Sequence, residues 1–225
     1  MSDWLTYSLG DFLLFSPRTY YRLFELYNAA IWPAQLIAFA AGLALLALPW
    51  LGGRHRGRVA AAILALCWAW VAWGFLYQRY QTINWAAVWI AAAFGVQAVL
   101  LAAAVATDRL APQRPQDLRS GAGYALLAWA VLLQPLLAPL LGRSWRQAEL
   151  FGTTPDPTVV ATLGILLLIR PQVWPVTAAL LPIPLLWCAF GGATLWAMRA
   201  PDAPVMPAAA VLALLLLLPR PVRGA

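Results

Sequence analysis

The sequence has no lysine, one histidine, two cysteines and few charged side chains of any kind. Charged residues make up 10% of its 225 residues, whereas about 25% is usual in soluble domains. This excludes a soluble globular protein, which needs more surface charge to stay in solution. The sequence also lacks a Gly-rich phosphate loop and a dinucleotide-binding pattern. Because only one histidine is available as a base, we do not expect an enzyme.

The residue types that usually bind metals are scattered. His55 lies in a loop rich in Arg, where positive charge opposes a cation. Cys67 and Cys188 both fall inside apolar runs, where a thiol usually serves as a small packing group. A disulfide or a soft-metal pair is the less favoured alternative. We therefore expect neither a metal site nor a cofactor.

Long apolar runs dominate the rest of the chain, and all 15 of its cations are Arg. Hydrophobic residues make up 63% of it, in runs of roughly 20 residues separated by short Arg-containing loops such as 54–58 and 109–119. The net charge of +7 would suggest nucleic acid in a soluble protein, but loop Arg residues are typical of topology anchors that contact anionic lipid. The sequence predicts an all-α polytopic transmembrane helix bundle, residues 1–225 forming one domain, with the lipid bilayer and not nucleic acid as its partner.

The first 28 residues are expected to form an interfacial segment that precedes the bundle of residues 29–218. Ser16 and Pro17 suit the start of a helix. The aromatic and apolar residues that follow share one helical face, and charged residues share the other, which favours a helix lying in the membrane interface. A lid over the bundle is the alternative. No basic start precedes the first long run, so that run is expected to act as an uncleaved anchor.

Six or seven spans are expected. Six runs are long enough or nearly so: 29–51, 59–77, 85–106, 121–141, 173–198 and 205–218. A further helix near 157–169 has about 13 residues, or about 20 Å, against about 30 Å of hydrocarbon. It is either re-entrant or crosses with local thinning of the bilayer.

The distribution of Arg between the loops decides between the two topologies. With seven spans, 9 Arg lie on the cytoplasmic side and 6 outside; with a re-entrant helix the division is 7 against 8. Because cytoplasmic loops carry the excess of cations, we predict seven spans, with the N-terminus outside and the C-terminus cytoplasmic.

Four segments together resemble a known family: residues 15–28, 79–87, 151–158 with the following 162–168, and 183–192. They are similar to an uncharacterised family of bacterial multi-pass membrane proteins, described only as a domain of unknown function. The resemblance covers nearly the whole chain, implies a setting in the bacterial inner membrane, and supplies no activity. In that family a Cys often stands between the two prolines where this chain has Asp156, which puts a thiol or metal role at this position in doubt.

Asp156, in Thr-Thr-Pro-Asp-Pro, is the first candidate for a functional residue. Prolines on both sides restrict its backbone, and short helices next to irregular backbone are how many transporters build their sites. Thr153, Thr154 and, as a possible partner, Arg170 complete a candidate substrate or ion site. The alternative is a capping Asp at the edge of the membrane, before a helix that opens with Pro157.

No charged residue falls in the middle of a predicted span, and this argues against a proton-coupled pump while leaving a passive pore or a carrier of apolar molecules. The polar residues found there are expected to pack helices together: Gln35, Gln97, Gln134, Thr162, Thr177 and Thr194.

A stripe formed by Trp70, Trp73 and Tyr77 is either bundle packing or a face that stacks a flat apolar ligand. Two functions follow from these candidates. One is a small-molecule or ion transporter or permeation protein. The other is a non-catalytic membrane subunit, or a binder of a flat apolar ligand, acting with other subunits or as a homo-oligomer.

Overall fold

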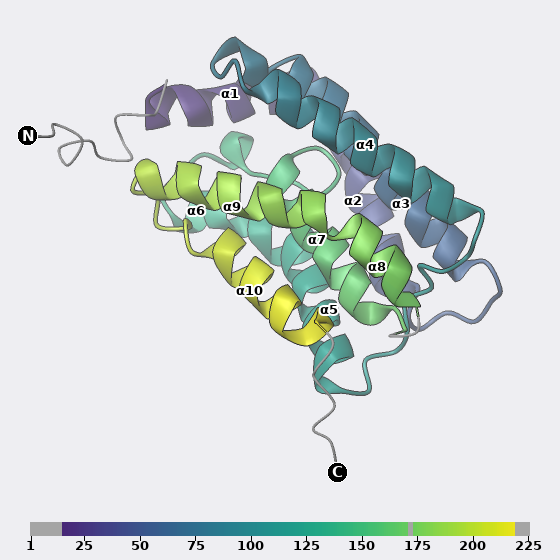
Figure 1. Cartoon of the computed structure of the whole chain (residues 1–225). Coiled ribbons are helices and arrows are strands. Elements are labelled where there is room, and N and C mark those ends of the chain that lie inside the picture. The colour runs from purple at the N-terminus through teal and green to yellow at the C-terminus, as the bar shows by residue number, and fades with distance from the viewer. Residues whose placement is uncertain (1–14, 171–172, 219–225) are drawn as a thin grey trace, which may run out of the picture.

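The computed structural model describes residues 15–170 and 173–218, and every regular element in these two ranges is a helix (Figure 1). The all-α prediction is thus confirmed. Arg220 and Arg223, which entered the topology count, lie outside the described residues.

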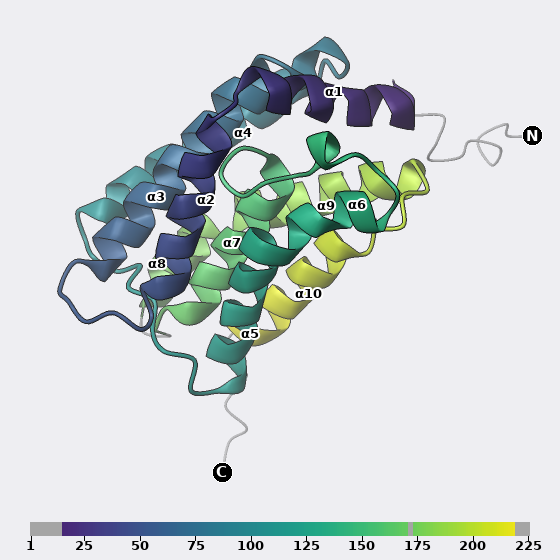
Figure 2. The same cartoon turned by 180° about the vertical axis from the view of Figure 1, so that it is seen from behind.

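The helices run back and forth between the two ends of the molecule (Figures 1 and 2). In chain order they are α1 (Pro17–Ala30), α2 (Ala34–Ala47), α3 (Arg56–Trp70) with its wider continuation η3 (Val71–Tyr77), η4 (Tyr80–Thr82), α4 (Ala87–Val105), α5 (Leu118–Ala128) with η5 (Trp129–Leu133), η6 (Gln134–Leu136) and α6 (Leu137–Leu140), η7 (Trp145–Gln147), α7 (Pro155–Leu168), α8 (Trp174–Leu180), α9 (Pro182–Ala197) and α10 (Val205–Leu217).

One end gathers the loops that precede α3 and α5 and the C-terminal end of α7. The backbone N–H of Gln113 donates to the carbonyl oxygen of Leu168 at 2.9 Å, and the Arg114 guanidinium donates to the carbonyl oxygen of Trp50 at 3.3 Å. The opposite end, which we call the lid end, is formed by α1 and the connections 78–86, 141–154 and 198–204. Successive connections therefore alternate between the two ends, as the sequence pattern predicts.

Helix α1 lies across the lid end and makes an angle of 95° with α2. It begins at the predicted place, because the Ser16 hydroxyl accepts a hydrogen bond from the backbone N–H of Thr19 at 3.2 Å. Its aromatic face is buried against the bundle, with the rings of Phe24 and Phe75 5.0 Å apart. The right angle agrees with a helix parallel to the membrane surface, and the buried face shows that this helix also covers the bundle, as the lid alternative proposed.

The short helix α7 lies in the middle of the bundle, between α5, α9 and α10, and all 14 of its residues are buried (Figure 2). It begins at Pro155, two residues earlier than predicted. It crosses α5 at two glycines: a Cβ built on Gly164 would lie 2.7 Å from the carbonyl oxygen of Gly123. The absence of side chains at this crossing lets the two backbones touch, which is how helices associate inside membranes.

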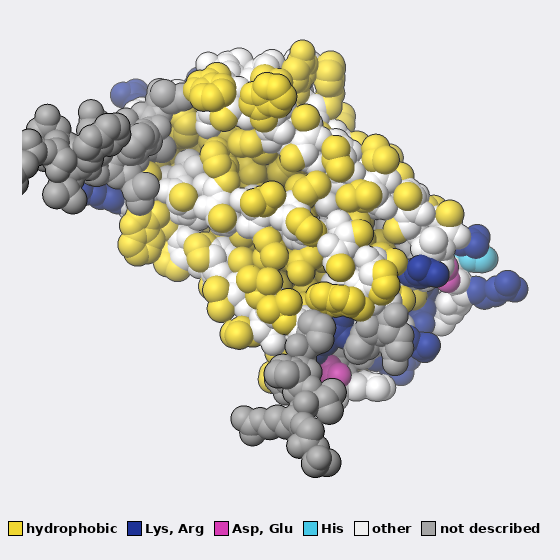
Figure 3. Space-filling model, in the orientation of Figure 1, with side chains coloured by type: hydrophobic (Ala, Val, Ile, Leu, Met, Phe, Trp, Pro, Cys, Tyr) yellow, Lys and Arg dark blue, Asp and Glu magenta, His cyan; other side chains and the backbone are white. Residues whose placement is uncertain are grey.

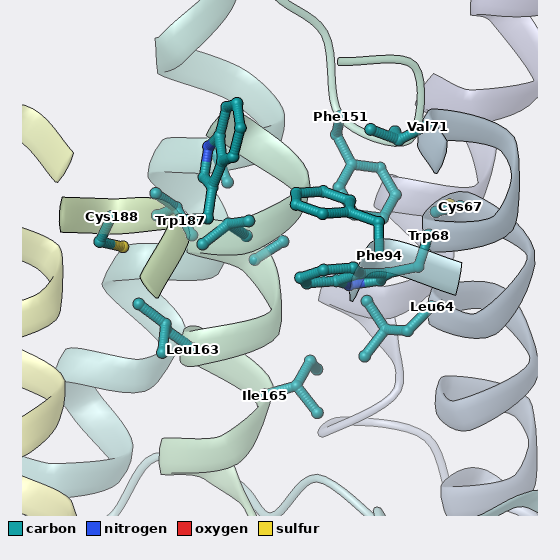
Figure 4. Packing of buried hydrophobic residues seen from close by; sticks show 14 of the residues in the cluster. Leu64, Cys67, Trp68, Val71, Phe94, Phe151, Leu163, Ile165, Trp187 and Cys188 are labelled. Carbon is teal, nitrogen blue, oxygen red and sulfur yellow. The ribbon is translucent and has the colours of Figure 1, made fainter. Parts of the chain in front are cut away.

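Aromatic side chains from three helices surround the middle of α7 (Figure 4). The Trp68 indole donates to the hydroxyl of Thr162 on α7 at 2.8 Å. Its ring lies 4.3 Å from that of Phe94, which in turn lies 5.3 Å from that of Trp187. Aromatic rings thus pack against the middle of α7, and one of them, the Trp68 indole, also holds it by a hydrogen bond.

Four helices among the described residues are long and apolar enough to cross a membrane, or five if the bent pair α1–α2 counts as one span. Helices α7 and α10 are apolar but shorter, with 14 and 13 residues. The predicted total of six or seven spans therefore stays a prediction. Apolar side chains cover the flank formed by α4, α8, α9 and α10, and cationic side chains gather at the ends (Figure 3). Such a surface fits a lipid environment.

Candidate ion site at the lid end

Three carboxyl groups from separate segments meet at the lid end. Glu149 belongs to the 141–154 connection, Asp156 to the first turn of α7, and Asp202 to the 198–204 connection. Together with Arg143 they line a cavity that leaves about 10 Å³ for the centre of a water molecule, enough for about one water. We call Glu149, Asp156 and Asp202 the carboxylate cluster.

Asp156 is held in place from α9. The Trp187 indole N–H donates to its Oδ1 at 2.7 Å, and the residue is 3% exposed. Gly191, one turn further along α9, lies beside it, since a Cβ there would be 3.4 Å from Oδ1, at the limit of ordinary contact. Thr154, not Asp156, is the N-cap residue of α7, and Pro155 is the first residue of the helix. The interpretation of Asp156 as a capping residue is therefore wrong: its carboxylate points to the indole of Trp187.

Asp202 is paired with Arg143, whose guanidinium donates to Oδ2. Both side chains are largely buried, at 6% and 13% exposed. The Arg143 guanidinium also lies 4.4 Å from the ring centre of Tyr21, so α1 covers it from outside. The other oxygen of Asp202, Oδ1, is buried and has no hydrogen-bond partner in the described part of the chain.

Glu149 is partly buried, and its Oε2 is shielded from solvent without a hydrogen-bond partner among the described residues. Burial and the neighbouring carboxyls of Asp156 and Asp202 raise the pKa of Glu149 well above its usual range, and Arg143 only partly opposes this. This shift favours the protonated form of Glu149 relative to an exposed Glu.

Gln134 adds a further polar group to the cavity wall. It is 5% exposed, and its Oε1 has no hydrogen-bond partner in the described residues. The other two buried Gln side chains fit the predicted packing role better, because the Gln35 and Gln97 amides donate to the carbonyl oxygens of Asn28 and Leu180 at 2.7 and 2.9 Å. Gln134 therefore belongs to the site as well as to the helix contacts.

Thr153 and Thr154 lie next to the site but do not line its cavity. Both hydroxyls donate to the carbonyl oxygen of Leu150, at 3.2 and 3.0 Å, and the Thr154 hydroxyl also accepts from the N–H of Leu150. Gly152 between them and Leu150 has a φ of +75°, which favours glycine. These residues shape the turn that brings Glu149 and Asp156 together.

Arg170 is exposed and lies past the C-terminal end of α7, whereas Asp156 is in its first turn. The structure therefore does not bring these two predicted partners together. Arg143, which the sequence interpretation did not single out, is the cation at the cluster.

The predicted aromatic stripe is on the outside of the bundle. Trp70, Trp73 and Tyr77 are 41%, 60% and 40% exposed, so this face does not lie in the interior of the bundle. Trp73 stacks on Tyr77, with ring centres 5.2 Å apart, and the Trp70 indole donates to the hydroxyl of Tyr27 at 2.8 Å. These contacts give the stripe a defined shape on the apolar surface, where a ligand face stays a prediction.

Sequence reasoning found one of the three acids. A signal for the others was present, because only eight acidic residues occur in the chain, and Glu149 and Asp202 fall in connections that alternating spans place on the same side as Asp156. Among the described residues, no group of three or more His, Cys, Asp or Glu side chains is arranged to hold a metal ion. The cluster is thus a set of acids around a water-sized space.

Comparison with curated proteins and with solved structures finds no match. A match to a family does exist, and it extends over residues 18–224, from the first turn of α1 to beyond α10. Every residue of the carboxylate cluster, together with Arg143 and Gln134, lies inside the matched range. The chain therefore belongs to DUF6064, a family of unknown function.

Proposed function

We propose that this protein is a multi-pass protein of the bacterial inner membrane that passes a small cation through the carboxylate cluster. The observation that supports this most is the charge balance around the cavity. Three carboxyl groups face one guanidinium, so the fully ionised site lacks positive charge. An uncompensated charge away from water costs several kcal/mol, which a bound cation offsets. A bound anion would instead add to the excess of negative charge around the cavity.

The path of the chain supports a role in transport. The connections alternate between two ends, and on the Arg count the lid end faces the outside, with seven crossings. The cluster then sits at the outer mouth of the bundle, at the N-terminus of the buried helix α7. A short helix that starts at an irregular turn beside buried polar groups is the arrangement on which many transporters build an ion site.

The ion selectivity of the purified, full-length protein in a planar bilayer tests this proposal. With a salt gradient across the bilayer, the reversal potential is expected to report cation selectivity. Asp156→Asn keeps an acceptor oxygen for Trp187 but removes the charge, and should reduce the current strongly. Asp117→Asn is the matched control, since Asp117 caps α5 at the opposite end and Asn also caps helices well.

Anion selectivity, or equal currents from both variants, would contradict a cation site at the cluster. Absence of current together with stable co-purification in a larger complex would favour the second function, a non-catalytic membrane subunit.

A further inference from the structure

The carboxylate cluster lacks hydrogen-bond donors, and this points to the ion that it takes. Two of its members have a fixed donor: Asp156 receives the Trp187 indole N–H, and Asp202 receives the Arg143 guanidinium. No such donor reaches the shielded Oε2 of Glu149 in the described part of the protein. Glu149 is thus the acid of the cluster whose shielded oxygen has no donor among the described residues, and Arg143 only partly offsets the cost of ionising it.

Two further oxygens on the cavity wall are also without a donor: Oδ1 of Asp202 and Oε1 of Gln134. Gln134 belongs to η6 and none of the acids does, so its unpartnered Oε1 is a separate observation from the unpartnered carboxyl oxygens. A buried acceptor left without a partner loses its hydrogen bonds to water and gains none in the protein, which destabilises the fold. Three such oxygens around one small cavity therefore need hydrogen-bond donors and not further acceptor groups.

A proton on Glu149 and one water molecule supply those hydrogen atoms. The protonated carboxyl offers one O–H, and a water offers two. The cavity has room for about one water and no more. Together they match the three unpartnered oxygens, whereas a metal ion would need several close ligands, and no group of three suitable side chains in the described ranges is arranged that way.

One polar side chain, Gln147, borders both this cavity and a surface cleft. Gln147 lines the cavity and also a cleft of about 630 Å³ between α1 and the 78–83 turn. Its side-chain amide donates to Glu25 on α1 at 3.5 Å, and Glu25 lines the same cleft. Gln147 therefore lies between this cleft and the cavity that Glu149 lines.

We propose that Glu149 is a proton-carrying residue, and that the cation taken by the site is a proton. In the step itself the O–H bond of the Glu149 carboxyl breaks, the electron pair stays on the carboxylate, and the proton passes to the water in the cavity; reprotonation reverses this. The groups that face Glu149 are Arg143 from its own connection, Asp156 from α7, Asp202 from the 198–204 connection, and Tyr20 and Tyr21 from α1.

Infrared difference spectroscopy of the full-length protein in lipid nanodiscs, recorded across a pH titration in H₂O and D₂O, tests this. We expect a C=O stretching band of a protonated carboxyl that disappears only above the ordinary Glu range and shifts in D₂O. Glu149→Gln should abolish it, and Asp117→Asn should leave it unchanged. Asp202→Asn, which removes a neighbouring negative charge, should keep the band but move its midpoint to lower pH.

Absence of the band in the wild type, or its persistence in Glu149→Gln, would overturn the inference. So would an Asp202→Asn midpoint at or above that of the wild type, which stays informative if Glu149→Gln does not fold. The inference rests on the proposed cation site, but the two fail separately. A titrating band without ion currents would refute transport but leave the proton site standing. Na⁺ or K⁺ currents without the band would refute the proposal that the ion is a proton.

Discussion

Substitution of Gly164 by Ala should destabilise the bundle, because α7 and α5 touch backbone to backbone at this point. A Cβ on Gly164 would lie 2.7 Å from the carbonyl oxygen of Gly123 and 2.9 Å from the backbone nitrogen of Leu127. Both atoms belong to the backbone of α5, so no side-chain rotation can relieve the contact. The first distance is 0.7 Å short of the 3.4 Å at which ordinary contact begins.

To accommodate the methyl group, α5 and α7 must separate along a crossing that lies in the centre of the bundle. Overpacking of this kind costs about 1–3 kcal/mol. The contact is reciprocal, since a Cβ on Gly123 would lie 2.7 Å from the carbonyl oxygen of Gly164. We therefore expect Gly123→Ala to have a similar effect, and the double variant to cost less than the sum of the two, because one separation relieves both clashes.

Unfolding in mixed micelles with a rising fraction of SDS, followed by circular dichroism, measures the change. Gly95→Ala on α4 is the matched control, because a Cβ there meets nothing within 4 Å. It should leave stability unchanged or raise it by up to about 1 kcal/mol, the difference in helix propensity. Equal unfolding midpoints for Gly164→Ala and Gly95→Ala would refute the close crossing of α5 and α7.

Three further variants test the ends of the bundle. Asp117→Ala should lower stability by about 0.5–2 kcal/mol, because it removes the N-cap of α5. Hydrogen bonds with Ser120 lower the pKa of Asp117, so the stabilisation is present above the usual Asp pKa and is lost as the pH falls through the lowered value. A pH series of unfolding midpoints checks this. Arg143→Gln should cost about 3–5 kcal/mol by leaving Asp202 buried and unpaired, and adding Asp202→Asn should recover much of the loss in the same unfolding assay. Because burial raises the pKa of Glu149, its contribution to stability is fully present below the ordinary Glu pKa and is lost as the pH rises through the raised value. Glu149→Gln should therefore be more stable than the wild type at neutral pH. The unfolding midpoints of the two proteins should approach each other in acid.

The helices could be predicted from the sequence because each apolar run and each loop is a local pattern. Ser16 and Pro17 locate the start of α1, and the short helix was placed within two residues of its observed start at Pro155. The short length of α7 can also be predicted from the sequence. Its position in the middle of the bundle cannot, because burial on every side depends on the neighbours of a helix and not on its own residues.

The candidate site could be predicted only in part. Asp156 stands out because prolines flank it, but Glu149 and Asp202 look like ordinary loop acids. Each predicted span taken by itself has no charge in its middle, which argues against a proton-coupled pump. In the folded protein two of the acids come from connections and Asp156 from the first turn of α7, and 46 positions separate Asp156 from Asp202 in the sequence. Their convergence follows from the alternation of the helices, which brings every second connection to the same end.

The aromatic stripe shows a second limit of sequence patterns. Its spacing fits one face of a helix, yet spacing alone does not say whether that face points inward. Within the same span, it is the indole of Trp68, two positions before Trp70, that packs against α7. In a membrane protein both faces of a span are apolar, so the amphipathic signal that separates them in soluble helices is missing.

The decay of an imposed pH gradient across liposomes that contain the purified protein tests the central claim most directly. A pH-sensitive dye inside the vesicles reports the rate, with valinomycin and K⁺ present to prevent a charge build-up. We predict that the wild type collapses the gradient, that Glu149→Gln loses most of this rate while keeping its helical spectrum, and that Asp117→Asn retains it. A wild-type rate equal to that of empty liposomes, or a Glu149→Gln rate equal to that of the wild type, would contradict a proton site at the carboxylate cluster.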